Sequence, residues 1–90
     1  MLVTLSNLND YAEKISEYFG CKEQDVEQAA SKIYNAACSQ GVSIYVEDGN
    51  KILFNVYEDE NFVNYLTPYD YNRLQEYYYE EILGELKRRA

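Results

Sequence analysis

Carboxylates crowd the second half of the chain, and their number and spacing make them the first candidates for chemistry. Between positions 42 and 86 there are ten acidic residues against two basic ones. Three groups stand out: a pair before a glycine, a run in the stretch EDEN, and a set near the C-terminus. They are Glu47, Asp48, Glu58, Asp59, Glu60, Glu76, Glu80 and Glu81. Such side chains can move protons, hold a cation or contact a basic surface.

Patterns that support catalysis or metal binding are missing from the sequence. The chain has no histidine, and no serine lies in a G-x-S-x-G setting, so acid and base catalysis would fall to carboxylates alone. The four glycines are scattered and form no phosphate-binding loop. The acidic runs are also too short for the twelve-residue calcium loop. We therefore expect a non-enzymatic protein with no metal and no cofactor.

Tyrosine is the second unusual feature, with eleven residues and no tryptophan. A tyrosine ring stacks on arginine and its hydroxyl forms hydrogen bonds, which explains why tyrosine is enriched at interfaces. Five fall on or beside expected core faces and are interpreted as structural: Tyr11, Tyr18, Tyr34, Tyr71 and Tyr78. Four do not: Tyr45, Tyr57, Tyr69 and Tyr77. Tyr57 and Tyr77 also adjoin carboxylates, so we predict that they join the eight acidic residues in a partner-binding surface.

Two helices are expected in the first half of the chain. After SNLND, apolar residues recur at helical spacing up to Phe19, and Gly20 suits a left-handed C-terminal cap. A second helix is expected over residues 22–40. Its packing face is predicted to hold Val26, Ala30, Ile33 and Ala37.

The period changes from helical to alternating over residues 42–57. Apolar residues occupy every second position on both sides of D-G, a strong signal for a tight hairpin. The inward set is Val42, Ile44, Val46, Ile52, Phe54 and Val56, and the other face displays Tyr45, Leu53, Tyr57 and Glu47. Residues 62–66 could add a third strand.

The best marked helix start lies at T-P-Y-D. Thr67 is expected at the N-cap, Pro68 at the first helical position and Asp70 near the positive end of the helix dipole. The helix should run to about position 88. Its inward face is predicted to hold Tyr71, Leu74, Tyr78, Ile82 and Leu86, which places Glu76, Tyr77 and Glu80 outward and Glu81 on the flank.

These elements predict an α+β fold: two N-terminal helices, a hairpin in a two- or three-stranded antiparallel sheet, and a long C-terminal helix. Ninety residues without a linker favour one domain over residues 1–90. Cys21 and Cys38 lack metal-site spacing and are expected to be core or half-buried residues. No signal peptide or membrane span is recognisable, so we expect a cytosolic protein without membrane contact.

Charge argues against direct binding to nucleic acid. The chain has 16 acidic and 8 basic residues, and three of the basic ones lie in its last four positions. Two helices followed by a hairpin also occur in winged-helix proteins. The outward positions of the second helix, however, include one base where phosphate binding needs several.

In size, charge and composition the chain resembles the small acidic anti-restriction and anti-CRISPR proteins of phages and mobile elements that mimic DNA. The resemblance implies a partner: a basic nucleic-acid-binding protein, either a CRISPR-Cas effector or a restriction enzyme. It also implies that such an inhibitor acts in the bacterial cytosol.

Two alternatives remain open. Colicin-type immunity proteins, which neutralise nuclease toxins, are similar in size and acidity, but they are all helical and the hairpin departs from them. A plain acidic interaction domain, with or without a homodimer, is the other alternative, because a charged face often serves solubility alone.

Overall fold

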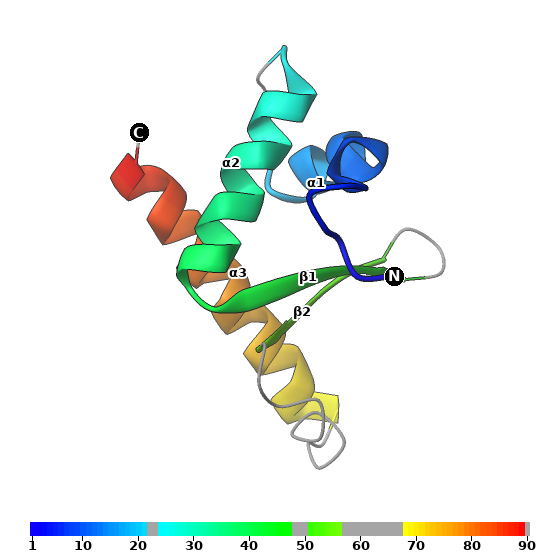
Figure 1. Cartoon of the computed structure of the whole chain (residues 1–90). Helices are drawn as coiled ribbons and strands as arrows, with labels where there is room; N and C mark the ends of the chain where they lie inside the picture. The colour runs from blue at the N-terminus through cyan, green and yellow to red at the C-terminus, as the bar shows by residue number, and fades with distance from the viewer. Residues whose placement is uncertain (22–23, 48–50, 57–67, 90) are drawn as a thin grey trace.

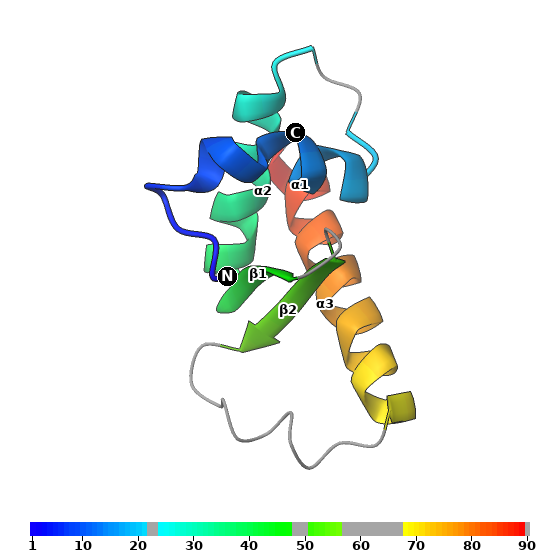
Figure 2. The same cartoon turned by 90° about the vertical axis from the view of Figure 1, so that its right-hand side faces the viewer.

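A two-stranded hairpin lies between a pair of N-terminal helices and a long C-terminal helix. The computed structural model describes residues 1–21, 24–47, 51–56 and 68–89. The order is a 3-10 turn η1 (Leu8–Tyr11), α1 (Ala12–Tyr18), α2 (Val26–Ser39), β1 (Val42–Glu47), β2 (Lys51–Val56) and α3 (Pro68–Arg89). Figure 1 shows α1 and α2 above the hairpin and α3 crossing behind it, and in Figure 2 α3 lies beside the hairpin. The predicted α+β class is confirmed.

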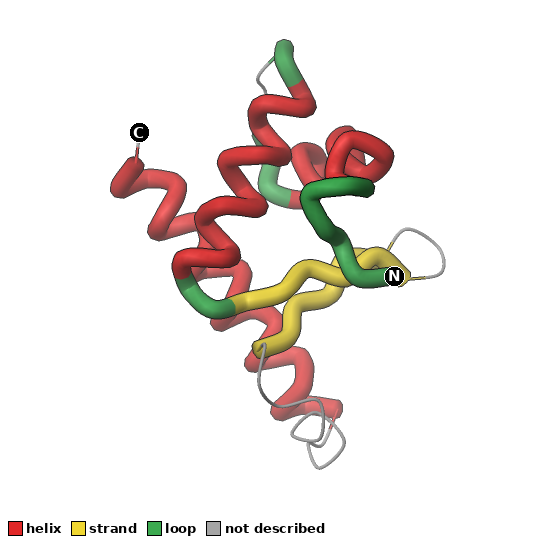
Figure 3. The backbone as a smooth tube through the Cα atoms, viewed as in Figure 1, coloured by secondary structure: helices red, strands yellow, loops and turns green. Residues whose placement is uncertain are grey.

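The N-terminal helical region is less regular than its periodicity suggested. Residues 8–11 form a 3-10 turn that continues into α1, so the first α-helix is short. Figure 3 draws the helical segments in red. Gly20 follows α1 with a φ of 66°, as the predicted left-handed cap requires. The Cys21 N–H donates to the Ser16 carbonyl, which closes the helix end.

Helix α2 begins four residues later than expected. Asp25 is its N-cap, and the Asp25 carboxylate accepts the Gln28 N–H at 3.1 Å. Val26 is therefore the first helical residue and is exposed, so its assignment to the packing face was wrong. The other predicted members of that face are buried, together with Ala29 and Ala36. These small side chains allow α2 to pack closely on its neighbours.

The hairpin has the predicted alternation. Val42 pairs with Val56 and Glu47 with Lys51, which leaves three residues for the connection. Val42, Ile44, Val46, Ile52 and Phe54 are buried, whereas Tyr45 and Leu53 on the opposite face are half-buried. The side chain of Val56 lies outside the description.

The first three residues extend the sheet on the free side of β1. Leu2 forms an antiparallel bridge with Tyr45. The Val3 N–H donates to the Ile44 carbonyl, and the Val46 N–H donates to the Met1 carbonyl, both at 2.9 Å. The predicted third strand at residues 62–66 falls outside the described residues. The additional pairing that the structure does show is N-terminal, and sequence periodicity over so short a segment gave no sign of it.

A single cluster of buried side chains joins all the described elements. Val3, Leu8, Ala12, Ile33, Ile44, Phe54, Tyr78 and Ile82 belong to it, with others. Helix α3 begins at Pro68 as predicted and ends at Arg89, and its core face includes Leu74, Tyr78 and Ile82. The Thr67 cap and the side chains of Asp70 and Tyr71 lie outside the description.

Candidate protein-binding surface on the C-terminal helix

Helix α3 presents all but one of the described residues of the predicted surface. Tyr78 is 7% exposed and Tyr77 is 58% exposed, because successive residues on a helix differ by roughly 100°. Glu76 and Glu80 are exposed, and Glu81 is half-buried. The helix therefore separates the YYY run as its periodicity predicts, with one ring in the core and one in solvent.

Three carboxylates of this surface have no ion-pair partner among the described residues. Within the described ranges, no ion pair or hydrogen bond joins the side chains of Glu76, Glu80 or Glu81 to another residue. Glu85 behaves differently, because its carboxylate accepts from Arg88 at 2.8 Å and from the Gln40 amide at 3.1 Å. Three carboxylates thus remain available to an external cation.

The predicted residues on α3 divide between two sides of the helix. Glu76 and Glu80 line an open groove of about 710 Å³ between the end of α1, β2 and α3. Tyr77 and Glu81 are not part of that groove. The described residues that line it are Tyr18, Lys51, Ile52, Leu53, Asn72, Gln75, Glu76, Tyr79 and Glu80. Figure 2 shows the three elements that supply these residues, α1, β2 and α3, next to one another.

Two aromatic residues in the lining of the groove, Tyr18 and Tyr79, belong to a cluster of contacting rings. Tyr79 stacks on Phe19 with ring centroids 4.9 Å apart, and the Tyr18 ring meets Tyr79 edge-on at 5.5 Å. Tyr18 also contacts Phe54 at 5.7 Å. Partial burial, and secondly the neighbouring Tyr79, raise the pKa of Tyr18. Tyr18 was expected on or beside a core face. It lies beside one: 41% of the residue is exposed, while its ring contacts the aromatic cluster.

Gln75 attaches α3 to the outer edge of β2. Its side-chain oxygen accepts the Phe54 N–H at 2.7 Å, and its side-chain nitrogen donates to the Phe54 carbonyl at 2.8 Å. Together these two bonds satisfy both backbone groups of one edge residue. The wall of the groove is thereby held in a fixed position relative to the strand.

Only one described candidate lies on the hairpin. Glu47 is exposed at the end of β1, 3.6 Å from the Met1 amino group and paired in register with Lys51. Its charge is therefore partly compensated. Asp48, Tyr57, Glu58, Asp59 and Glu60 lie outside the described residues.

Sequence reasoning missed several residues that shape the groove. Asn72, Gln75 and Tyr79 were not predicted, although they recur with the predicted Glu76 and Glu80 at three-to-four spacing, a signal that could have identified a second face of α3. Tyr18 and Lys51 could not be found in this way, because tertiary packing brings them to the helix.

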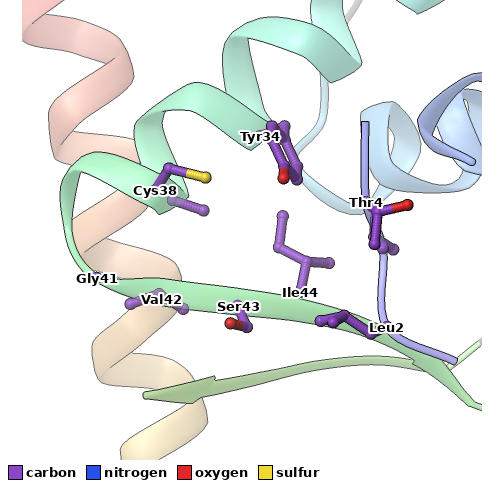
Figure 4. A pocket seen from close by; sticks show the side chains of 10 residues that line it. Leu2, Thr4, Tyr34, Cys38, Gly41, Val42, Ser43 and Ile44 are labelled. Atoms are coloured by element: carbon purple, nitrogen blue, oxygen red, sulfur yellow. The ribbon is translucent and has the colours of Figure 1, made fainter. Parts of the chain in front are cut away.

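A second cavity of about 290 Å³ lies between the N-terminal segment, α2 and β1. Figure 4 shows Tyr34, Cys38, Ile44 and Leu2 around it. The lining is mainly apolar. Cys38 is exposed here, contrary to the prediction that it is at least half-buried, whereas Cys21 is intermediate as expected.

Neither a metal cluster nor a membrane span is found in the described part of the chain. No three residues of the types His, Cys, Asp and Glu gather there in a metal-binding group. None of its helices combines the length and apolarity needed to cross a membrane. Comparisons with protein-family models, curated proteins and solved structures found no match for the chain.

Proposed function

We propose that this protein is a non-enzymatic inhibitor that occupies the basic nucleic-acid-binding surface of a bacterial defence protein. The target class is a CRISPR-Cas effector or a restriction enzyme, met in the bacterial cytosol. The acidic, tyrosine-bearing surface of α3 takes the place of nucleic acid on that target. The observation that supports this proposal most directly is that Glu76, Glu80 and Glu81 form no ion pair with any described residue.

Helix geometry makes these carboxylates suitable for such a contact. Glu76 and Glu80 are separated by about 6 Å along the axis at 1.5 Å per residue. Lys51 lines the same groove as Glu76 and Glu80, but α3 itself carries no basic residue between positions 74 and 86. A basic groove that normally binds phosphates attracts charges of this sign and spacing. The exposed Tyr77 ring adds a surface on which an arginine can stack.

Competition with nucleic acid provides the test. Purified CRISPR-Cas effectors and restriction enzymes are assayed for binding to labelled DNA or guide RNA by fluorescence anisotropy with increasing inhibitor. We expect displacement from one target, with an affinity that falls steeply between 50 and 200 mM salt, on the order of tenfold or more. Retained inhibitor binding at saturating nucleic acid would refute mimicry.

A charge-neutralised variant separates specific contacts from general acidity. Changing Glu58, Glu60, Glu76 and Glu80 to Gln should abolish displacement without unfolding the chain. A matched control removes charge elsewhere: Glu13→Gln with Glu27→Gln, both exposed in the first turns of α1 and α2. If the quadruple variant keeps full activity, the protein is a plain acidic interaction domain. Rescue from a nuclease toxin, without effect on defence enzymes, would identify an immunity protein instead.

A further inference from the structure

Hydrogen-bond alternation defines which backbone groups lie on the outer edge of β2. Val3 and Met1 bond to Ile44 and Val46 of β1, so the backbone groups of those two residues point away from β2. In an antiparallel pair, alternate residues direct their N–H and C=O to the same side. The register pairs Ile44 with Phe54 and Val46 with Ile52. The backbone groups of Ile52 and Phe54 therefore point to the outer edge.

The Gln75 side chain bonds to Phe54, one of these two edge residues. It does not bond to the other, Ile52. The Gln75 amide bonds to both backbone groups of Phe54, as a neighbouring strand would. No hydrogen bond from another described residue reaches the outward groups of Ile52. Ile52 lines the groove beside α3 and also an adjoining cavity of about 300 Å³, which Lys14, Glu17 and Tyr18 complete. The two hollows meet at Tyr18 and Ile52.

The side chains around this edge favour binding of a positively charged group. Glu17, Glu76 and Glu80 are exposed and carry no ion pair to other described residues. Lys51 and Lys14 also lie on the rim, so the excess of negative charge is one unit locally and larger over the whole chain. The exposed ring of Tyr18 lies between the two hollows. An arginine can stack on such a ring while it donates to a carboxylate.

We propose that the partner contributes an extended segment bearing arginine or lysine, which adds to the outer edge of β2 at Ile52. The segment's backbone bonds to Ile52, one basic side chain lies between Tyr18 and the carboxylates Glu76 and Glu80, and Gln75 limits the pairing to this short stretch. Strand addition gives affinity through the backbone and specificity through alternate side chains. This inference rests on the proposed function and names the part of the partner that the groove receives.

The direct test uses the full isotope-labelled chain and a synthetic peptide. The probe is a nine-residue peptide of alternating arginine and threonine, and its control has glutamate in place of arginine. We expect intermolecular NOEs between the peptide backbone and Ile52, with shifts in the Tyr18 ring signals, for the arginine peptide only. The proposal is overturned if the arginine peptide does not bind at 1 mM, or if its NOEs map to Tyr77 or to the cavity beside Cys38.

Variants on the two sides of α3 provide a matched comparison. Glu76→Gln with Glu80→Gln should lower the affinity for the arginine peptide by about tenfold, the size expected from losing charge-assisted hydrogen bonds. Tyr77→Ala with Glu81→Gln changes the side of α3 outside the groove and should alter affinity by less than about twofold. Equal weakening by both pairs would contradict groove binding, as would perturbation of the same groove signals by single-stranded DNA.

The experiments distinguish an error in the groove assignment from an error in the proposed function. If displacement of nucleic acid from a defence enzyme survives Glu76→Gln with Glu80→Gln but is lost with Tyr77→Ala and Glu81→Gln, the function stands and the groove assignment falls. If the arginine peptide binds at Ile52 but nucleic acid never competes with the enzyme, the groove assignment stands and the mimic function falls.

Discussion

Adjacent tyrosines on α3 have opposite roles because one residue step turns a helix through roughly 100°. Tyr78 belongs to the core cluster, and its ring lies 5.9 Å from that of Tyr77, which is largely in solvent. Residue type therefore says little here about role. Position around the helix decides it.

Truncating these two side chains to alanine should change the free energy of unfolding by very different amounts. Tyr78→Ala is expected to lower the free energy of unfolding by about 3 kcal/mol or more, because it leaves a cavity in the core. Tyr77→Ala should change it by less than about 0.5 kcal/mol and should instead weaken target binding. Urea unfolding followed by circular dichroism measures both. Comparable destabilisation by Tyr77→Ala would show that the helix is rotated from the position described.

The hydroxyl of Tyr78 predicts a dependence of stability on alkaline pH. Burial first, and the neighbouring Tyr77 second, raise the pKa of Tyr78 above its ordinary value of 10.0. The unfolded chain therefore loses this proton before the folded protein does. The stabilising contribution is complete below pH 10 and is lost as pH rises from there through the folded pKa. Urea unfolding between pH 8 and 11 should show this decline, and Tyr78→Phe should make it shallower. An unchanged slope in that variant would assign the effect to other groups.

At the scale of elements, the connection between α2 and β1 depends on the backbone conformation of a glycine. Gly41 has a φ of 70°, a left-handed conformation that L side chains adopt at a cost. No atom lies within 4 Å of where its Cβ would stand, so any penalty for a side chain comes from the backbone alone. Gly84 differs because it lies within α3, where an added Cβ would meet an Arg88 nitrogen at an ordinary 3.7 Å.

Alanine substitutions at these glycines should act in opposite directions. Gly41→Ala is expected to destabilise the protein by about 1–2 kcal/mol through backbone strain. Gly84→Ala is expected to stabilise it by up to about 1 kcal/mol, because alanine has the higher helix propensity. Thermal unfolding of both variants beside the parent chain checks the signs. A stabilised Gly41→Ala variant would contradict the left-handed turn.

At the scale of the whole molecule, repulsion among like charges acts across its full width. The chain carries a net charge of −8, and the described residues span 39 × 28 × 21 Å. At 0.01 M ionic strength the screening length is about 30 Å, close to these dimensions. Carboxylates on separate elements therefore repel one another in dilute buffer, which destabilises the compact state.

Added salt should consequently stabilise the free protein while it weakens the proposed complex. We expect the thermal midpoint to rise between 10 mM and 0.5 M sodium chloride, because the screening length falls to a few ångströms and the repulsion is removed. The Glu13→Gln, Glu27→Gln variant has less charge and should show a smaller rise. A midpoint that falls with salt would mean that attractive ion pairs outweigh the repulsion.

The sequence by itself determined the local features of this protein. Alternation fixed the hairpin and its buried face, and helical spacing identified Tyr78 as core and Glu76, Tyr77 and Glu80 as exposed, because both periods follow from backbone geometry. Only the tertiary structure decided which residues of different elements contact one another. It placed residues 1–3 beside β1, set Gln75 against Phe54, and brought Tyr18 and Lys51 to the wall of α3. Such contacts depend on how the helices cross the sheet, and no pattern within a single segment encodes that crossing.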